Sequence, residues 1–344
     1  MLFKIYGRNP AGLMLERMKQ SSNYKKGTFQ NISDTPAMAP GVSFLKILDA
    51  FLNRPSNISP AVGLPFVKTD LHSYRTDEAT ITWFGHSSYF IHIQDKNILV
   101  DPVFSGSASP FGFMMRAFKG SNEYSVADFP QIDLLLLTHD HYDHLDYKTV
   151  SLLKAGVKKI VCSLGVSSHL VYWGFAEKNI TELDWWDTCL VAQDLSLTAA
   201  PARHFSGRGT KRGATLWSSF ILKTTDYKLY LGGDSGYDDH FKEIGEKHGP
   251  FDIAILECGQ YNQWWPYIHM MPEETVQAAI DLKAKWLMPV HWGKFALSLH
   301  PWDEPIKRVT EEAAKLNVNV TTPMIGEPVI LHKNYPQKRW WALK

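Results

Sequence analysis

The chain has 344 residues and a formal net charge of +1, and it carries no block of like charges. Its length allows one α/β sandwich with an extension to bury a large core. The near-neutral charge gives no electrostatic reason to expect a nucleic-acid partner.

Three cysteines lie far apart in the chain, at Cys162, Cys189 and Cys258. An odd, sparse set of this kind is typical of reduced thiols in a cytosol-like compartment. The first residues lack an apolar core long enough for a secretory signal, and no later segment is long enough to span a bilayer. We therefore expect a cytoplasmic protein, with peripheral membrane contact and homodimer formation left open.

Residues 1–78 are expected to form an N-terminal extension that packs on a main domain at residues 79–344. Within the extension, residues 44–52 place apolar side chains at helical spacing, with Lys46 and Asp49 on the other face. We expect this helix to pack on the main domain. The alternative is that its apolar stripe forms a lipid-binding surface.

The main domain is expected to begin with three strands, at residues 80–84, 89–93 and 98–100. Residues 85–88 read as a turn between the first two strands. The third strand leads directly into Asp101.

The largest group of closely spaced potential metal ligands follows a short apolar run at residues 134–137. An uninterrupted apolar run bounded by polar residues is typical of a strand buried on both faces. Directly after it come four potential metal ligands, His139, His141, Asp143 and His144. Alternation along an extended backbone lets the first two histidines point the same way. The other two then form a second ligand set, so the loop suits two adjacent metal ions better than a plain polar turn.

Asp143 could also cap a helix expected at residues 147–153. After it we expect a strand at 159–162, a helix near 167–174 and a strand at 195–200 that leads to His204. A hairpin of strands at 217–224 and 228–231 should lead to Asp234, followed by a core strand at 251–257. A helix at 272–283 with Pro at its start then precedes a strand at 286–290 that leads to His291.

The potential ligands share one property: each falls at or just beyond the expected carboxyl end of a strand. They are His139, His141, Asp143, His144, His204, Asp234 and His291. Any one of them alone would be an ordinary turn residue. Strand ends that converge on one rim provide the arrangement that a metal site needs.

The HxHxDH pattern at residues 139–144 resembles the signature of the metallo-β-lactamase superfamily. The resemblance implies an αββα sandwich, with two mixed β-sheets flanked by helices and a dinuclear metal site at one edge. Most of residues 80–300 further resembles N-acylphosphatidylethanolamine-hydrolysing phospholipase D and its bacterial relatives. The more specific matches are Leu183-Asp184-Trp185-Trp186 and His291-Trp292-Gly293.

The resemblance implies two ligand sets. One metal would be held by His139, His141 and His204, and the other by Asp143, His144 and His291. Asp234 would bridge the two. Asp101 would hydrogen-bond the ligating histidines, although an ordinary turn aspartate is equally expected at that position.

The resemblance also places His269 near the scissile phosphate, where it would bind the phosphate or protonate the leaving oxygen. His269, Asp143 and Asp234 are thus the expected catalytic residues. Tyr261 and Trp265 are expected to contact the substrate together with His269.

The spacing and identity of the potential ligands distinguish this chain from other branches of the metallo-β-lactamase superfamily. The 57 positions from Asp234 to His291 cannot hold the extra domain of β-CASP nucleases. Flavodiiron proteins have a Glu in the metal loop and a flavodoxin domain, and zinc β-lactamases typically have Cys where Asp234 stands. The chain departs from the phospholipase D pattern at Phe205, Ser235 and Ile268. These departures affect the expected identity of the substrate more than the expected type of reaction.

The expected reaction is hydrolysis of a phosphodiester by a metal-bridging hydroxide, between two divalent ions about 3.5–4 Å apart. Zinc suits the His-rich ligands, and iron or manganese fit similar sites. In the family the products are an N-acylethanolamine and phosphatidic acid. The alternatives are a lactonase or a soluble-phosphodiester hydrolase of the same fold, and a non-catalytic metalloprotein.

A phospholipid substrate would need an apolar docking surface, whereas a small soluble substrate would not. The candidate segments are residues 44–52, 111–115, 264–267 and 338–341. Each is also expected as ordinary core or interface packing.

Overall fold

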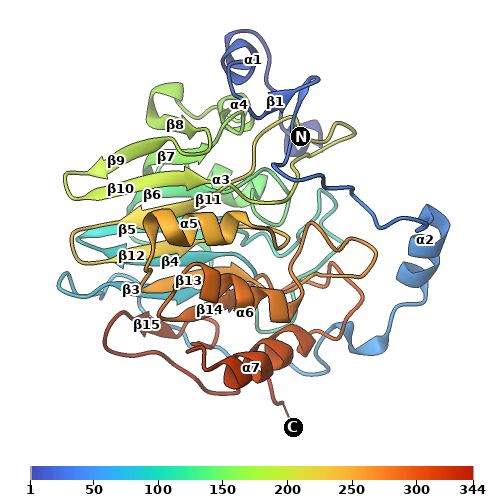
Figure 1. The fold of residues 1–344 in the computed structure, drawn as a ribbon. Coiled ribbons are helices and arrows are strands. Elements are labelled where there is room, and N and C mark those ends of the chain that lie inside the picture. Colours follow the sequence, from blue (N-terminus) through green and yellow to red (C-terminus); the bar gives the residue numbers. More distant parts are fainter. Residues whose placement is uncertain (1, 344) are drawn as a thin grey trace.

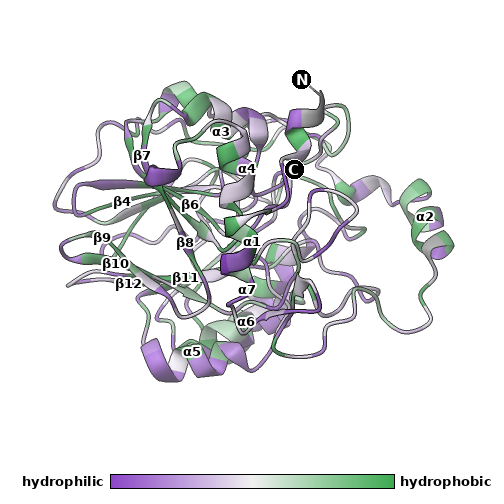
Figure 2. Cartoon of the chain, turned by 90° about the horizontal axis from the view of Figure 1, so that it is seen from above, coloured by the Kyte–Doolittle hydropathy of each residue, from purple (hydrophilic) through white to green (hydrophobic). Residues whose placement is uncertain are grey.

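The computed structural model of the chain describes residues 2–343. Within that range two large β-sheets stack face to face, and helices cover the outer face of each (Figures 1 and 2). Both sheets mix parallel and antiparallel strands. The αββα fold predicted from the sequence is therefore confirmed.

The first sheet has the strand order β15-β3-β4-β5-β6-β7-β8. Its strands are β3 (Thr80–Trp83), β4 (Tyr89–Ile93), β5 (Lys96–Val100), β6 (Ile132–Leu137), β7 (Val157–Ser163), β8 (Ile180–Leu183) and β15 (Pro328–Ile330). The second sheet has the order β14-β13-β12-β11-β10-β9. Its strands are β9 (Thr188–Ala192), β10 (Leu195–Ala200), β11 (Ser219–Lys223), β12 (Lys228–Leu231), β13 (Ile253–Glu257) and β14 (Leu287–Val290).

Helices on the two outer faces complete the sandwich (Figure 2). The first sheet carries α3 (Tyr147–Leu153) and α4 (Ser167–Tyr172), and the second carries α5 (His240–His248), α6 (Pro272–Asp281) and α7 (Glu304–Leu316). The N-terminal part adds α1 (Leu13–Met18), the small pair β1 (Tyr24–Lys25) and β2 (Thr28–Phe29), and α2 (Phe44–Leu52). Short 3-10 helices lie at Leu2–Tyr6, Ser56–Ile58, Val126–Asp128 and Glu177–Asn179.

Strand β6 pairs along both edges with parallel neighbours, β5 and β7, and each of its faces packs into a hydrophobic core. Because side chains alternate along a strand, Leu134 and Leu136 enter the core between the sheets. Leu135 and Leu137 enter the core under α3 and α4. This confirms the prediction of a strand buried on both faces, and it places the end of β6 at the rim of the sandwich.

The cap of helix α3 differs from the prediction. The side chain of Asp146 accepts a hydrogen bond from the backbone N–H of Lys148 at 3.1 Å. The prediction that Asp143 caps this helix was wrong, because an N-cap directly precedes the first helical residue and α3 begins at Tyr147. Asp143 is left free to face the rim of the sheets.

Helix α2 lies at the edge of the sandwich on two long connections (Figures 1 and 2), with Ile47 lining a cavity of the main domain and Lys46 Nζ 5.3 Å from the centroid of the Trp264 ring. Its apolar face was expected to pack on the main domain, but Leu45 and Leu52 are 74% and 76% exposed. Leu48 is also exposed, and the side chain of Phe44 lies outside the described part of the structure. Ile47 and Phe51 are half-buried, so the prediction is confirmed for one side of the apolar face and wrong for its three exposed leucines. The division of the chain at residue 78 stays a prediction.

Other apolar segments differ in exposure. Trp340 and Trp341 are buried and pack against Trp292, so of the two alternatives left open for this segment the two tryptophans follow the packed one. By contrast, Phe111 and Phe113 are exposed on a loop. No helix within residues 2–343 has both the length and the apolar character needed to cross a bilayer.

Candidate metal centre

The potential ligands meet at one rim of the sandwich, where strands of both sheets end. Strand β6 leads to the loop with His139, His141, Asp143 and His144, and strands β10, β12 and β14 lead to His204, Asp234 and His291. The structure thus brings together the seven residues predicted from the sequence. Together with His86 they form two groups of four, and a third, overlapping group joins Asp234 and His291 to His269; the ligand atoms within each group lie within 4.8 Å of one another.

The first group consists of His139, His141, His204 and Asp234. His141 Nδ1 lies 3.0 Å from His139 Nε2 and 3.2 Å from His204 Nε2. Asp234 Oδ2 lies 3.8 Å and 3.6 Å from the same two Nε2 atoms. Burial lowers the pKa of all three histidines, which leaves neutral imidazoles with lone pairs available to a cation.

The second group consists of His86, Asp143, His144 and His291. Asp234 connects it to the first group, because its two carboxylate oxygens lie 3.1 Å from His144 Nε2 and 3.3 Å from His291 Nε2. Burial alone would raise the pKa of Asp234, but His144 and His291 hold that pKa well below its usual range. A charged carboxylate shared by two sets of imidazoles is the arrangement expected of a bridging ligand.

His86 was missed by the sequence analysis, which assigned it to a turn. Its Nε2 lies 2.9 Å from Asp143 Oδ2, and its ring lies 4.0 Å from the ring of His291. The backbones explain this proximity: His86 N–H donates to Trp292 O, and His291 N–H donates to His86 O. Burial lowers the pKa of His86 to about 3, so its imidazole is neutral and can orient Asp143 or act as a ligand.

The chemistry of this set fits divalent metal ions. His144 Nε2 and Asp234 Oδ1 are buried and have no hydrogen-bond partner among the described residues. Unpartnered buried polar atoms are rare and need a compensating interaction. Imidazole nitrogens and carboxylate oxygens at this density are the donors that zinc and related ions prefer.

Asp101 contacts His144 of the second group and orients its ring. Its carboxylate accepts hydrogen bonds from the backbone N–H and the hydroxyl of Thr138, at 2.9 Å and 2.5 Å. Its Oδ2 also lies 2.8 Å from His144 Nδ1. Such a contact fixes the ring of His144 with Nε2 toward the centre. The structure thus gives Asp101 the contact expected of an orienting residue.

A cavity of about 350 Å³, here called the central cavity, opens above the ligands. His269 lines it, and Glu257 Oε1 lies 3.4 Å from His269 Nδ1. Glu257 is fully buried at the end of β13, and the sequence analysis missed it. Its carboxylate turns one nitrogen of His269 toward the core, which leaves the other for a molecule in the cavity.

Two residues predicted to contact substrate lie in different places. Trp265 lines the central cavity, and its indole N–H donates to the Gln260 carbonyl at 2.9 Å. Tyr261 lines a different cavity, where its hydroxyl donates to Glu304 and its ring stacks on His300. The structure therefore does not bring Tyr261 to the metal centre. Phe205 and Ile268, where the chain departs from the phospholipase D pattern, both line the central cavity.

Comparison with known proteins identifies the family. A β-lactamase superfamily domain matches residues 96–292. The chain belongs to the β-lactamase superfamily. With the ligand set described above, this makes it a metal-dependent hydrolase of the metallo-β-lactamase fold.

Individual relatives of this hydrolase differ in what their names state. The uncharacterized protein Rv0906 of Mycobacterium tuberculosis is 36% identical over 337 residues, covering 94% of this chain and 88% of that protein. N-acyl-phosphatidylethanolamine-hydrolyzing phospholipase D 1 of Caenorhabditis elegans is 30% identical over 63% of this chain and 64% of its own length. Among solved structures, the metallo hydrolase Igni18 of Ignicoccus hospitalis shares the fold, with a TM-score of 0.58, 19% identity and coverage of 74% and 99% of the two chains.

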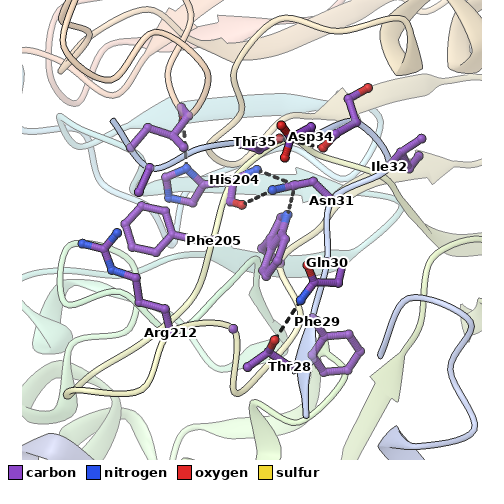
Figure 3. Close-up of a pocket in the computed structure, with 15 residues that line it drawn as sticks. Thr28, Phe29, Gln30, Asn31, Ile32, Asp34, Thr35, His204, Phe205 and Arg212 are labelled. Carbon is purple, nitrogen blue, oxygen red and sulfur yellow. Dashed lines mark hydrogen bonds between the residues drawn. The ribbon is translucent and has the colours of Figure 1, made fainter. Parts of the chain in front are cut away.

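The N-terminal part of the hydrolase is attached to the ligand loops (Figure 3). Asn31 Nδ2 donates to His204 O at 2.8 Å, and Asn31 Oδ1 accepts from His204 N–H at 3.0 Å. The same Oδ1 accepts from Trp217 Nε1 at 3.1 Å. Next to it, Arg203 donates to the Thr35 hydroxyl and the Asp34 carbonyl. The backbone of His204 is thus held by a side chain from about 170 residues earlier in the sequence.

Lys294 of the hydrolase is fully buried three residues after His291. Its Nζ donates to the carbonyls of Phe84 and Val103 at 3.1 Å and 2.9 Å. Burial lowers the pKa of Lys294 to about 7, whereas a lysine in the unfolded chain titrates near ~10.4. Between these values the unfolded chain binds more protons, so this group makes stability rise with pH.

We therefore expect Lys294→Met to remove part of this pH dependence. The free energy of unfolding of the wild type, relative to the variant, should increase from pH 7 to pH 9 by up to ~1.4 kcal/mol per pH unit. Denaturant unfolding of identically prepared proteins at both pH values measures this difference. Lys242→Met, at an exposed lysine, is the control and should show a constant difference. Parallel pH profiles for Lys294→Met and wild type would contradict the prediction.

Proposed function

We propose that this hydrolase holds two divalent metal ions, best suited to zinc, and cleaves the phosphodiester of N-acylphosphatidylethanolamine-like lipids. The observation that carries the proposal is the pair of ligand groups that meet at Asp234 beneath the central cavity. The name and 30% identity of the nematode relative support the substrate class. A lactonase or a soluble-phosphodiester hydrolase is the alternative.

In this mechanism the side chains of the protein would bind the metal ions and orient the substrate. His139, His141, His204 and Asp234 would hold one ion, and Asp143, His144, His291 and Asp234 the other, with His86 in contact with Asp143. When bound, two such ions supply an activated water and neutralise charge on the phosphate. His269, oriented by Glu257, is placed to bind a phosphate oxygen or to protonate the leaving oxygen.

The two ions of the proposed centre support an anionic substrate. Two divalent ions would face the two carboxylates of Asp143 and Asp234, and the histidines of the first group are neutral. The buried carboxylates of Asp101 and Glu257 lie next to other histidines of the centre, so the support comes from direct contact between the ions and a charged phosphate oxygen, which a neutral lactone lacks, and not from the net charge of the centre.

The surroundings of the central cavity support a lipid substrate. Ile47 of α2 and Met115 of the neighbouring loop both line the cavity. On the outside, Leu45, Leu52 and Phe113 are at least 74% exposed. Exposed apolar groups on the same two segments that line the cavity suit peripheral contact with a lipid surface, from which an acyl chain could enter.

Cations next to this apolar surface suit phospholipid headgroups. A cavity of about 380 Å³, here called the basic cavity, is lined by Arg54, Arg116 and Lys119 and by no carboxylate within residues 2–343. Met115 lines both the basic and the central cavity. Basic groups near a membrane surface each contribute about 1 kcal/mol of attraction to anionic lipids.

Metal analysis and vesicle hydrolysis together test the proposal. We expect about two metal ions per chain and release of phosphatidic acid from N-acylphosphatidylethanolamine vesicles, lost with a chelator and restored by zinc. Two ions with inert vesicles but hydrolysis of bis(p-nitrophenyl) phosphate would replace the lipid substrate by a soluble phosphodiester. Protein without bound metal that still hydrolyses the vesicles would contradict the proposed mechanism.

Asn31 provides a test of the ligand arrangement. Asn31→Ala removes both hydrogen bonds to the His204 backbone, so His204 should be less well positioned. We expect about a 10- to 100-fold loss of affinity for the more weakly held zinc ion, measured by competition with a chromophoric chelator. Gln30→Ala is the matched control, because the Gln30 side chain donates to the Thr28 hydroxyl and, among residues 2–343, makes no hydrogen bond to His204. Equal affinity in Asn31→Ala and wild type would show that the His204 backbone needs no such support.

A further inference from the structure

A second cavity of about 310 Å³, here called the polar cavity, adjoins the central cavity (Figure 3). Residues 28–35 of the N-terminal part form one side of it, with hydroxyl, amide and carboxylate groups such as those of Gln30, Ser33 and Asp34. His204, Phe205 and Arg212 line both cavities. A molecule bound at the metal centre can therefore extend a polar substituent into this second cavity.

Arg212 stands at the boundary between the two cavities. Its guanidinium carbon lies 4.7 Å from the centroid of the Phe205 ring, and Figure 3 shows the two side chains next to each other. The Phe205 ring lies 4.6 Å from the ring of His141 and 4.9 Å from that of His204. The guanidinium is thus one aromatic ring away from two ligands of the metal centre. Stacking on a ring restrains a guanidinium while its N–H groups stay free to donate.

Within the described part of the chain, the guanidinium of Arg212 has no counter-charge. Nearby Arg203 lies 3.8 Å from the Asp238 carboxylate, and Arg208 donates to three backbone carbonyls. Within residues 2–343, Arg212 has neither an ion-pair partner nor a hydrogen-bond acceptor. An exposed arginine held in place without a partner is suited to an anionic ligand.

The loop that carries Arg212 is attached at its base. Gly213 N–H donates to Ser206 O at 2.9 Å, and Gly213 O accepts from Phe29 N–H at 2.8 Å. These bonds join the loop to strand β2 of the N-terminal part. The position of Arg212 relative to the polar cavity is therefore built into the fold.

We propose that Arg212 is an anion-recognition residue: its guanidinium binds an oxyanion of a phosphodiester whose polar substituent occupies the polar cavity. The proposal rests on the proposed function, because it concerns the substrate of the same centre. A planar guanidinium offers two parallel N–H donors that match two oxygens of a phosphate. Arg212 would therefore select charged phosphodiesters over neutral esters.

Binding of inorganic phosphate tests the anion site without any turnover. Zinc-loaded wild type, Arg212→Ala and Arg212→Lys are titrated by calorimetry, with Lys211→Ala as the control. Lys211 is an exposed cation in the same loop that lines neither cavity. We expect Arg212→Ala to weaken phosphate binding by about 10-fold or more, Arg212→Lys to retain part of the affinity, and Lys211→Ala to match the wild type. Equal phosphate affinity in Arg212→Ala and wild type would overturn the proposal.

Kinetics distinguish recognition of charge from a structural role. For bis(p-nitrophenyl) phosphate we expect Arg212→Ala to raise KM about 10-fold with kcat within about twofold, and for neutral p-nitrophenyl acetate to change neither. Equal losses on both substrates would assign Arg212 a structural role instead.

Soluble glycerophosphoethanolamine should compete better than inorganic phosphate in wild type, and equal competition would remove the polar cavity from the proposal. A wild type that hydrolyses neither substrate would refute the proposed function, whereas the phosphate titration would still decide the role of Arg212.

Discussion

Replacing Asp234 by asparagine is expected to lower kcat/KM for phosphodiester hydrolysis by roughly 10³-fold or more, the largest effect predicted for this protein. The Asp234 carboxylate lies within 3.8 Å of imidazole nitrogens from both ligand groups. An amide has nearly the same shape but no negative charge, so it cannot balance two divalent ions. Bound metal, measured by elemental analysis, should fall below two per chain.

The matched control for this change is Asp239→Asn, at an exposed aspartate five residues along the same loop. It should keep full activity and metal content. Circular dichroism checks that both variants stay folded. An Asp234→Asn protein with two bound ions and near-normal turnover would show that Asp234 is not a bridging ligand. Lost turnover in a folded variant would exclude a purely structural role for the site.

Replacing His269 by alanine should lower kcat by roughly 10²- to 10⁴-fold while the protein keeps its metal ions. His269 lines the central cavity and its ring lies 5.0 Å from that of His204 and 5.1 Å from that of His291. Glu257 already occupies one side of its imidazole. The expected separation of turnover from metal content follows, because His269 acts on the substrate and not on the ions.

His72→Ala is the control, because His72 is exposed and lines none of the cavities described above. A substrate with a better leaving group should recover part of the rate in His269→Ala if His269 protonates the leaving oxygen. An equal loss for good and poor leaving groups would restrict His269 to phosphate binding. Loss of one metal ion in His269→Ala would instead make it a ligand.

The metal ligands could be predicted because their signal is local. His139 to His144 occupy one loop directly after a buried strand, and parallel strands end at a common edge. His204, Asp234 and His291 each follow an apolar strand in the same way. The carboxyl ends of these strands could therefore be expected to meet without knowledge of the strand order in each sheet.

The residues that were missed act through distant contacts. His86 reaches the centre because its backbone pairs with that of residues 291 and 292, and Glu257 is a single carboxylate in an apolar strand. Asn31 lies in a segment without a regular pattern and reaches His204 across 173 positions. Sequence neighbours carry no information about such contacts. Only the buried carboxylate at the end of β13 offered a signal that could have been used.

The sequence alone located the strands and the potential metal ligands at their carboxyl ends, because strand periodicity and ligand spacing are local properties of the chain, whereas the αββα fold and the two complete ligand groups were expected from the family resemblance. The tertiary structure decided what surrounds the centre. It left Leu45, Leu48 and Leu52 of α2 exposed and placed Tyr261 in another cavity. It also placed Arg212 beside Phe205 with no ion-pair partner among the described residues. These outcomes depend on how segments far apart in the sequence pack together, since burial and charge pairing are set by all neighbours in space.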